Sequence, residues 1–151
     1  MPEIYVDADG CPVKDEVYRV AGRYGLTVWM VANAWLRVPD DPSIRRVTVG
    51  EGLDRADDWI AERIGPGDIV ITADVPLAAR CVAKGARAIT PGGRRFDQSS
   101  IGAALADRNL MTALRETGEI RGGGRPFTKQ DRARFLNALD AAIQAIRRAG
   151  A

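Results

Sequence analysis

The sequence contains no histidine among its 151 residues. This absence excludes Ser-His-Asp and Cys-His triads, H-E-x-x-H zinc sites and proton relays through imidazole. Any catalysis must therefore use carboxylates, lysine, cysteine or a bound metal. Cysteine is scarce as well, because only Cys11 and Cys81 are present, in different segments and without CxxC spacing. Neither a disulfide framework nor a thiolate zinc site is indicated.

Long apolar runs are also missing. The chain has no stretch of about 18 apolar residues, and its N-terminus shows no charged segment followed by an apolar one. We therefore expect a cytoplasmic protein with no membrane association. The length suits one folded unit, so we expect residues 1–151 to form a single domain.

Charge is distributed unevenly along the chain. Residues 1–75 carry 8 Lys and Arg against 14 Asp and Glu, a net charge of −6, whereas residues 76–151 carry 14 against 6, a net charge of +8. This asymmetry suits a protein that holds a cation beside a polyanion. The alternative is that the two halves interleave in the fold and the charges average out.

Short β-branched runs alternate with longer helical patterns, which is typical of repeated β-α units and a mostly parallel sheet. The pattern predicts an α/β fold of three layers, with a five-stranded sheet in the order 3-2-1-4-5 and C-terminal helices. Near the last helix, Thr128 and Asp131 resemble an N-cap with an acidic third residue. The predicted strands are 3–8, 26–32, 45–49, 68–73 and 86–90, and the predicted helices are 12–24, 54–64, 76–84, 98–117 and 128 to the C-terminus.

Aspartates lie at the carboxyl ends of the first and fourth predicted strands, which are neighbours in this order. Asp7 and Asp9 lie at the end of the first strand and Asp74 at the end of the fourth. Open parallel sheets bind ligands outside the carboxyl ends of their strands, where the winding direction reverses. Carboxylates this close repel unless a cation lies between them, and Mg²⁺ takes oxygen ligands. We therefore predict a Mg²⁺ site, with the alternative that Asp9 only caps the helix at Pro12.

A second acidic group lies in GLDRADDWI, where Asp54, Asp57 and Asp58 share one face of a predicted helix. The helix dipole also favours acids in a first turn, which accounts for at least one of them. We assign Asp54 and Asp57 to the metal site and Asp58 to the surface.

Candidate substrate-binding residues lie near the crevice and in the basic half. Lys14 and Asn33 follow the first and second strands, although each has a plain alternative as a solvated lysine or a loop asparagine. Arginines flank two glycine-rich loops, where they could contact phosphates. The substrate-binding candidates are Lys14, Asn33, Arg94, Arg95 and Arg125, and further basic residues near the loops are Arg121, Lys129, Arg132 and Arg134.

Four segments, DADGCPVK, GLDRADDWI, GDIVITADVPLAARCVAKGA and RPFTKQDRARF, together resemble the YaiI/YqxD family of bacterial proteins. The resemblance runs through nearly the whole chain. That family is grouped with PIN-like domains, in which clustered acids on a parallel sheet hold Mg²⁺ or Mn²⁺ for cleavage of RNA or DNA. The resemblance implies a PIN-like fold and matches the acidic site positions to Asp7, Asp9, Asp54, Asp57 and Asp74.

The hypothesis that follows is a Mg²⁺- or Mn²⁺-dependent nuclease acting on nucleic acid, RNA in particular, with Asp7, Asp9, Asp57 and Asp74 as catalytic residues. One alternative is a haloacid-dehalogenase-like phosphatase, because D-A-D-G matches that nucleophile motif. There Asp7 would attack phosphorus, but a helix starting at Pro12 leaves no room for the usual hairpin flap. The other alternative is a non-catalytic RNA-binding module, and a homodimer is left open.

Overall fold

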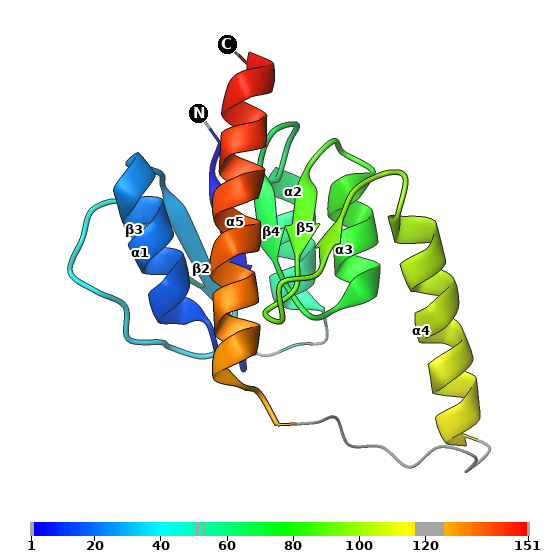
Figure 1. Cartoon of the computed structure of the whole chain (residues 1–151). Helices are drawn as coiled ribbons and strands as arrows, with labels where there is room; N and C mark the ends of the chain where they lie inside the picture. Colours follow the sequence, from blue (N-terminus) through cyan, green and yellow to red (C-terminus); the bar gives the residue numbers. More distant parts are fainter. Residues whose placement is uncertain (1, 51, 53, 117–125, 151) are drawn as a thin grey trace.

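The computed structural model of the chain describes residues 2–50, 52, 54–116 and 126–150 (Figure 1). Strands and helices alternate as the sequence predicts. In chain order the elements are β1 (Ile4–Asp7), α1 (Lys14–Tyr24), β2 (Val28–Ala32), β3 (Ile44–Thr48), α2 (Arg55–Arg63), β4 (Ile69–Ile71), α3 (Val75–Val82), β5 (Arg87–Ile89), β6 (Arg95–Phe96), α4 (Ile101–Glu116) and α5 (Lys129–Gly150).

The strands form an open sheet in the order β3-β2-β1-β4-β5-β6. The first five are parallel, so the predicted order 3-2-1-4-5 is confirmed. The central strand is β1, where Ile4 lies opposite Val28 of β2 and Ile69 of β4. The carboxyl ends of β1 and β4 therefore lie side by side.

The sixth strand was not predicted. β6 pairs antiparallel with β5 after a tight turn, in which the Gly93 N–H donates to the Thr90 carbonyl at 2.9 Å. Gly93 has φ of +92°, and a Cβ there would lie 2.7 Å from the backbone carbonyl carbon of Arg134. Glycine at this position therefore lets the turn pack directly against α5.

Helices cover both faces of the sheet and give the three predicted layers (Figure 1). One face carries α1 and α5, and Phe135 and Leu139 of α5 pack with Ile4 and Val6 of β1. The other face carries α2 and α3, with Ala104 of α4 joining the same apolar cluster at its margin. In Figure 1, α4 stands at the outer side of the molecule beyond α3.

Local signals explain several helix ends. α5 begins with the predicted capping arrangement, in which the Thr128 N–H donates to Asp131 at 2.9 Å and the Asp131 N–H donates to the Thr128 hydroxyl at 3.1 Å. α1 ends at Gly25, which adopts the left-handed conformation with φ of 66°. Among the described helices, none combines the length and apolar character needed to cross a membrane.

Candidate functional site

Asp7 ends the central strand β1 and lies half-buried at the carboxyl edge of the sheet. Its Oδ2 accepts a hydrogen bond of 2.9 Å from the Thr72 hydroxyl, which lies just past the end of β4. Burial raises the pKa of Asp7, the Thr72 hydrogen bond opposes that rise, and the negative charges of Asp74 and Asp9 add to it. Asp7 is therefore a carboxylate whose ionised form is disfavoured in the folded protein.

Thr72 connects Asp7 with Asp74. Its side-chain oxygen also accepts a 3.0 Å hydrogen bond from the Asp74 N–H, and only 3% of Thr72 is exposed. Asp74 in turn caps α3, because its Oδ1 accepts from the Leu77 N–H at 3.0 Å. One carboxylate oxygen of Asp74 thus caps the N-terminus of α3. The Thr72 hydroxyl, bonded to both Asp7 and the Asp74 N–H, fixes the positions of these two acids relative to each other.

Removing the Thr72 hydroxyl tests this connection. We expect Thr72→Val to lower the free energy of unfolding by about 1–3 kcal/mol, because the Asp7 carboxylate and the Asp74 N–H lose a buried partner. The same change should raise the pKa of Asp7 further, since the hydrogen bond now lowers it. Urea unfolding and NMR titration measure the two effects. Thr72→Ser keeps the hydroxyl and should stay more stable than the valine variant; the opposite order would contradict the assignment.

Asp9 lies in the turn after β1 and does not cap α1. Its Oδ2 accepts a 2.9 Å hydrogen bond from the Asn33 N–H, which follows β2. The helix begins only at Lys14, and its N-cap residue, Val13, makes no side-chain capping bond. The capping interpretation of Asp9 is therefore wrong, because the start of the helix is too far along the chain.

Asp57 lies in the first turn of α2 and is half-buried. Burial, followed by the negative charges of Asp74, Asp7 and Asp54, raises its pKa to about 6, and Arg80 acts in the opposite direction. Asp54 immediately precedes α2 with φ of 61°, a conformation that aspartate tolerates better than most residues, and its side chain makes no capping bond. The next acid, Asp58, is exposed and paired with Arg80 at 2.9 Å, as expected for a surface charge.

The predicted acidic residues from β1 and α2 face one cavity of about 270 Å³. Asp74 does not line it, although its charge reaches both Asp7 and Asp57. In the described ranges, no three His, Cys, Asp or Glu side chains stand close enough to share one metal ion. The carboxylates therefore surround a space instead of converging on one point. The lining residues are Asp7, Asp9, Asn33, Asp54, Arg55, Ala56 and Asp57.

The predicted substrate-binding residues are spread over several places. Asn33 lines the acidic cavity, whereas Lys14 begins α1 and is not among the lining residues. Arg94 is exposed and lies 4.8 Å from the centre of the Phe96 ring, and Arg95 projects from β6. Arg125 lies outside the described residues. The roles of these residues in substrate binding stay predictions.

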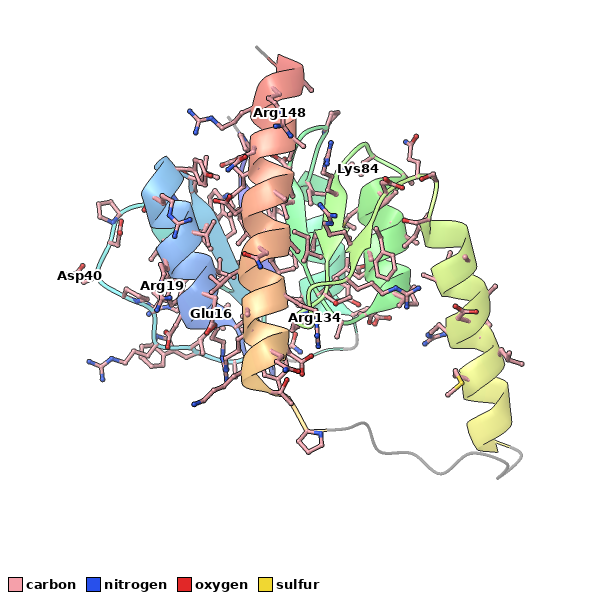
Figure 2. The ribbon with its side chains drawn as sticks, in the orientation of Figure 1. Glu16, Arg19, Asp40, Lys84, Arg134 and Arg148 are labelled. Carbon is pink, nitrogen blue, oxygen red and sulfur yellow. The ribbon has the colours of Figure 1, made fainter. Side chains whose placement is uncertain are left out.

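Two arginines of the basic half are engaged within the protein. Arg132 donates to the Pro12 carbonyl at 2.6 Å and pairs with Glu16 at 3.1 Å, and Arg134 pairs with Asp131. Glu16 and Arg134 are labelled in Figure 2, toward the same end of the molecule. The Arg132–Glu16 pair connects α5 to α1, whereas the Arg134–Asp131 pair lies within the first turns of α5.

Sequence reasoning missed Arg55 as a cavity residue and Trp35 as an exposed ring. Arg55 follows Asp54 directly, so its place at the start of α2 was the available signal. Trp35 is 66% exposed, whereas Trp29 and Trp59 are half-buried beside each other. The available signal was position, because Trp29 and Trp59 fall within a predicted strand and a predicted helix, whereas Trp35 falls in the connection between two predicted strands.

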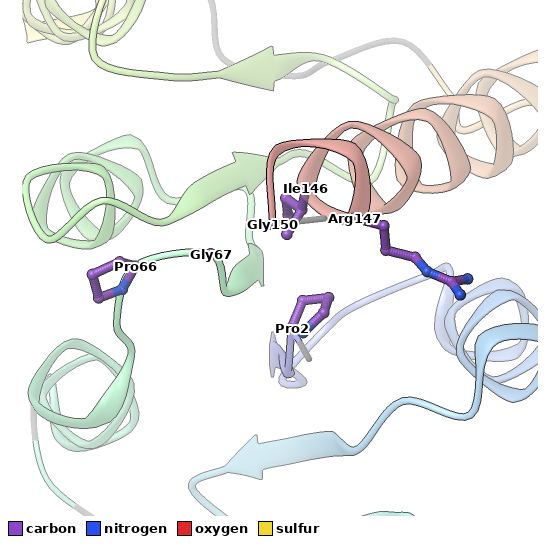
Figure 3. A pocket seen from close by; sticks show the side chains of 6 residues that line it. All are labelled: Pro2, Pro66, Gly67, Ile146, Arg147 and Gly150. Atoms are coloured by element: carbon purple, nitrogen blue, oxygen red, sulfur yellow. The ribbon is translucent and has the colours of Figure 1, made fainter.

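A second cavity of about 300 Å³ lies at the opposite end of the sheet, beside Pro2, Pro66 and the last turn of α5 (Figure 3). Among the described residues that line it, Arg147 is the charged one, and it extends toward α1, where its guanidinium lies 5.3 Å from the centre of the Tyr24 ring. These lining residues include no carboxylate side chain, and none of them lines the acidic cavity.

Together these features define an open, mostly parallel α/β protein with carboxylates gathered at the switch point of its sheet. The chain belongs to the family described as "Uncharacterized BCR, YaiI/YqxD family", whose model matches residues 5–145. The resemblance drawn from the sequence is thereby confirmed.

Relatives in several bacteria share most of their length with this chain. A "UPF0178 protein" of Rhodopseudomonas palustris (strain BisB18) is 61% identical over 145 residues, which cover 96% of this chain and 94% of the relative. One from Nitrobacter winogradskyi is 61% identical, covering 97% and 93%, and one from Bradyrhizobium sp. (strain ORS 278) is 59% identical, covering 96% and 88%. No solved structure matches the chain.

Proposed function

We propose that this protein is a nuclease that depends on Mg²⁺ or Mn²⁺ and hydrolyses phosphodiester bonds of nucleic acid, RNA in particular. One observation carries the proposal: carboxylates from β1 and α2 surround one cavity, where burial and mutual repulsion raise the pKa of Asp7 and Asp57. A divalent cation would relieve that repulsion.

The donor set fits a hard cation. The cavity offers carboxylate and amide oxygens without histidine or thiolate, which suits Mg²⁺ or Mn²⁺ better than zinc. Mg²⁺ commonly uses only one or two protein carboxylates and completes its shell with water and substrate phosphate. A site without three converging acids therefore suffices, with Asp7 as the main ligand and Asp9, Asp54, Asp57 or Asp74 beside it.

Each residue has a defined part in this proposal. Thr72 fixes the Asp7 carboxylate, and the Asn33 N–H holds Asp9 at the cavity wall. Asp57, with a pKa of about 6, is suited to accept a proton near neutral pH. Asp7 and the carboxylates beside it would hold the cation, and the chemistry it would supply is acidification of an attacking water and neutralisation of charge on the leaving oxygen.

The dehalogenase-like alternative gains no support from the geometry. Residues 8–13 join β1 to α1 as turns, without a strand that could begin a hairpin flap. We therefore do not propose it.

The proposal is tested with the purified full-length chain and labelled single-stranded RNA and DNA. We expect cleavage with Mn²⁺ or Mg²⁺ and none with EDTA, because the acidic cavity needs the cation to act. Asp58→Asn, prepared in parallel, should cut as the parent does, since Asp58 is engaged with Arg80 outside the cavity. Cleavage that persists in EDTA, or no cleavage with either metal, would refute the nuclease. Binding without cleavage would instead favour the RNA-binding module.

A further inference from the structure

Trp35 is the most exposed large apolar side chain among the described residues, at 66%. It follows Asn33 by two positions in the connection between β2 and β3. The two other tryptophans are half-buried: Trp29 stacks with Tyr5, and Trp59 packs at a tilt against both rings, so they contribute to the apolar cluster on one face of the sheet. Trp35 gains no such burial, and its ring is largely open to solvent.

Arg46 of β3 braces this ring. Its guanidinium carbon lies 4.8 Å from the centre of the Trp35 ring, a cation–π arrangement that holds the indole in place. Within the described part of the chain, Arg46 forms no ion pair. The neighbouring Arg37 is exposed as well. An exposed aromatic ring beside an arginine is a combination that binds single-stranded nucleic acid, with bases stacked on the ring and phosphates held by the guanidinium group.

The sheet register places Arg46 close to the carboxyl edge of the sheet but on the other face from the acidic cavity. Arg46 shares the α1 face with Val6, whereas Asp7, the next residue, points to the α2 face. Arg46 lies opposite Met30, and Met30 lies opposite Val6, the residue before Asp7. Two strand spacings of about 4.8 Å separate β3 from β1, so the Arg46 backbone lies roughly 10 Å from the end of β1. Asn33 links the same connection to the site, because its N–H is bound to Asp9.

Two negatively charged residues share the surface beside Arg46. Asp40 and Asp41 line a depression that Arg46 also borders, and Asp40 is labelled on the outer part of this connection in Figure 2. The Asp41 carboxylate accepts two hydrogen bonds from Ser43, at 2.9 Å from its N–H and 2.7 Å from its hydroxyl. Neither acid lies between Asn33 and Trp35 in the chain.

We propose that Trp35, braced by Arg46, is a base-stacking platform for a single-stranded nucleic acid that passes over the carboxyl edge of the sheet to the acidic cavity. The inference rests on the proposed nuclease function, which gives nucleic acid as the substrate class. It narrows that class to single-stranded nucleic acid. A base must be unpaired to stack on a protein ring, so the platform selects single strands over duplexes.

The test measures binding apart from cleavage, by fluorescence anisotropy of a labelled single-stranded oligonucleotide in EDTA. We expect Trp35→Ala to raise the dissociation constant about five- to 150-fold, which corresponds to the loss of one stacked base. Trp35→Phe should retain most of the affinity, because phenylalanine also offers an aromatic face. Duplex binding should change little in either variant.

Arg46→Ala and Arg148→Ala form a matched pair for charge. Both remove one exposed arginine, but Arg148 lies near the far end of α5 from Arg134 (Figure 2). We expect Arg46→Ala to weaken single-strand binding more than Arg148→Ala does. Equal effects would mean that general electrostatic attraction explains the binding.

Failure of the platform and failure of the nuclease are distinguishable. If the parent cuts RNA with Mn²⁺ while Trp35→Ala binds single strands as tightly as the parent, the platform is wrong and the nuclease stands. If Trp35 governs single-strand binding but no metal supports cleavage, the platform stands and the nuclease fails. A parent that binds no single strand in EDTA overturns the platform. So does sedimentation in which Trp35→Ala converts a dimer to a monomer, because the ring would then be a protein contact.

Discussion

Asp7→Asn should abolish metal-dependent cleavage and at the same time make the protein more stable to heat. We expect the cleavage rate to fall by more than about a hundredfold, since the main carboxylate ligand is lost. The melting temperature should rise, because the folded protein disfavours the ionised Asp7, whose pKa burial raises. Asparagine has the same size and still accepts the Thr72 hydrogen bond. Single-turnover cleavage and thermal unfolding measure the two effects.

Two further variants separate the loss of the Asp7 carboxylate as a metal ligand from a general change in net charge. Asp58→Asn changes the net charge equally but removes a carboxylate engaged with Arg80, so it should leave cleavage intact. Asp74→Asn keeps a good N-cap residue at the start of α3, so it tests the charge of Asp74 without unfolding the helix. If Asp7→Asn together with Asp74→Asn still cuts at the parent's rate, the site is misassigned.

Divalent cations should stabilise the protein at neutral pH and lose that effect in acid. At a free Mn²⁺ concentration of about 100 times the dissociation constant, the stabilisation is about 2.7 kcal/mol, or roughly 5–10 °C for a chain of this size. The pKa of Asp57 is raised from 3.8 to about 6, so protons compete with the cation below that range. We therefore expect a full shift in melting temperature at about pH 7.5 and a small one at about pH 5.

The raised pKa of Asp57 also sets the direction in which the stability of the metal-free protein changes with pH. Because the pKa of Asp57 is higher in the folded state than in the unfolded state, stability without metal should fall as pH rises from about 4 to about 6 and stay lower above that. Asp57→Asn should flatten this part of the profile, whereas Asp58→Asn should not. An Mn²⁺ shift of equal size at both pH values, or one unchanged in Asp7→Asn, would speak against cation binding at this cavity.

The sheet order could be predicted because the chain alternates strands and helices and parallel connections allow few orders. The two residues of β6 could not, because Arg95 and Phe96 are too few to show a strand period. Their pairing depends on the turn at Gly93 and on the packing of that turn against α5. β6 therefore forms because of tertiary contacts, which a local sequence pattern does not show.

The acidic crevice was predictable for a similar reason. Asp7 ends one buried strand and Asp74 follows the neighbouring one, so the order of the strands places both acids at the same edge of the sheet. What each carboxylate binds was not predictable: Asp74 caps α3, while Asp9 accepts from Asn33, a residue 24 positions away. Capping depends on where a helix begins to within a residue, and α1 begins two residues later than Pro12.

The position of α5 has a consequence for synthesis of the chain on the ribosome. The helix follows every strand in sequence, yet Phe135, Leu139 and Ile143 cover apolar residues of β1, the first strand made. A nascent chain therefore exposes that strip of the sheet until the 22-residue helix has left the exit tunnel. Over that interval, the emerging polypeptide would be a natural target for chaperones that bind apolar surface.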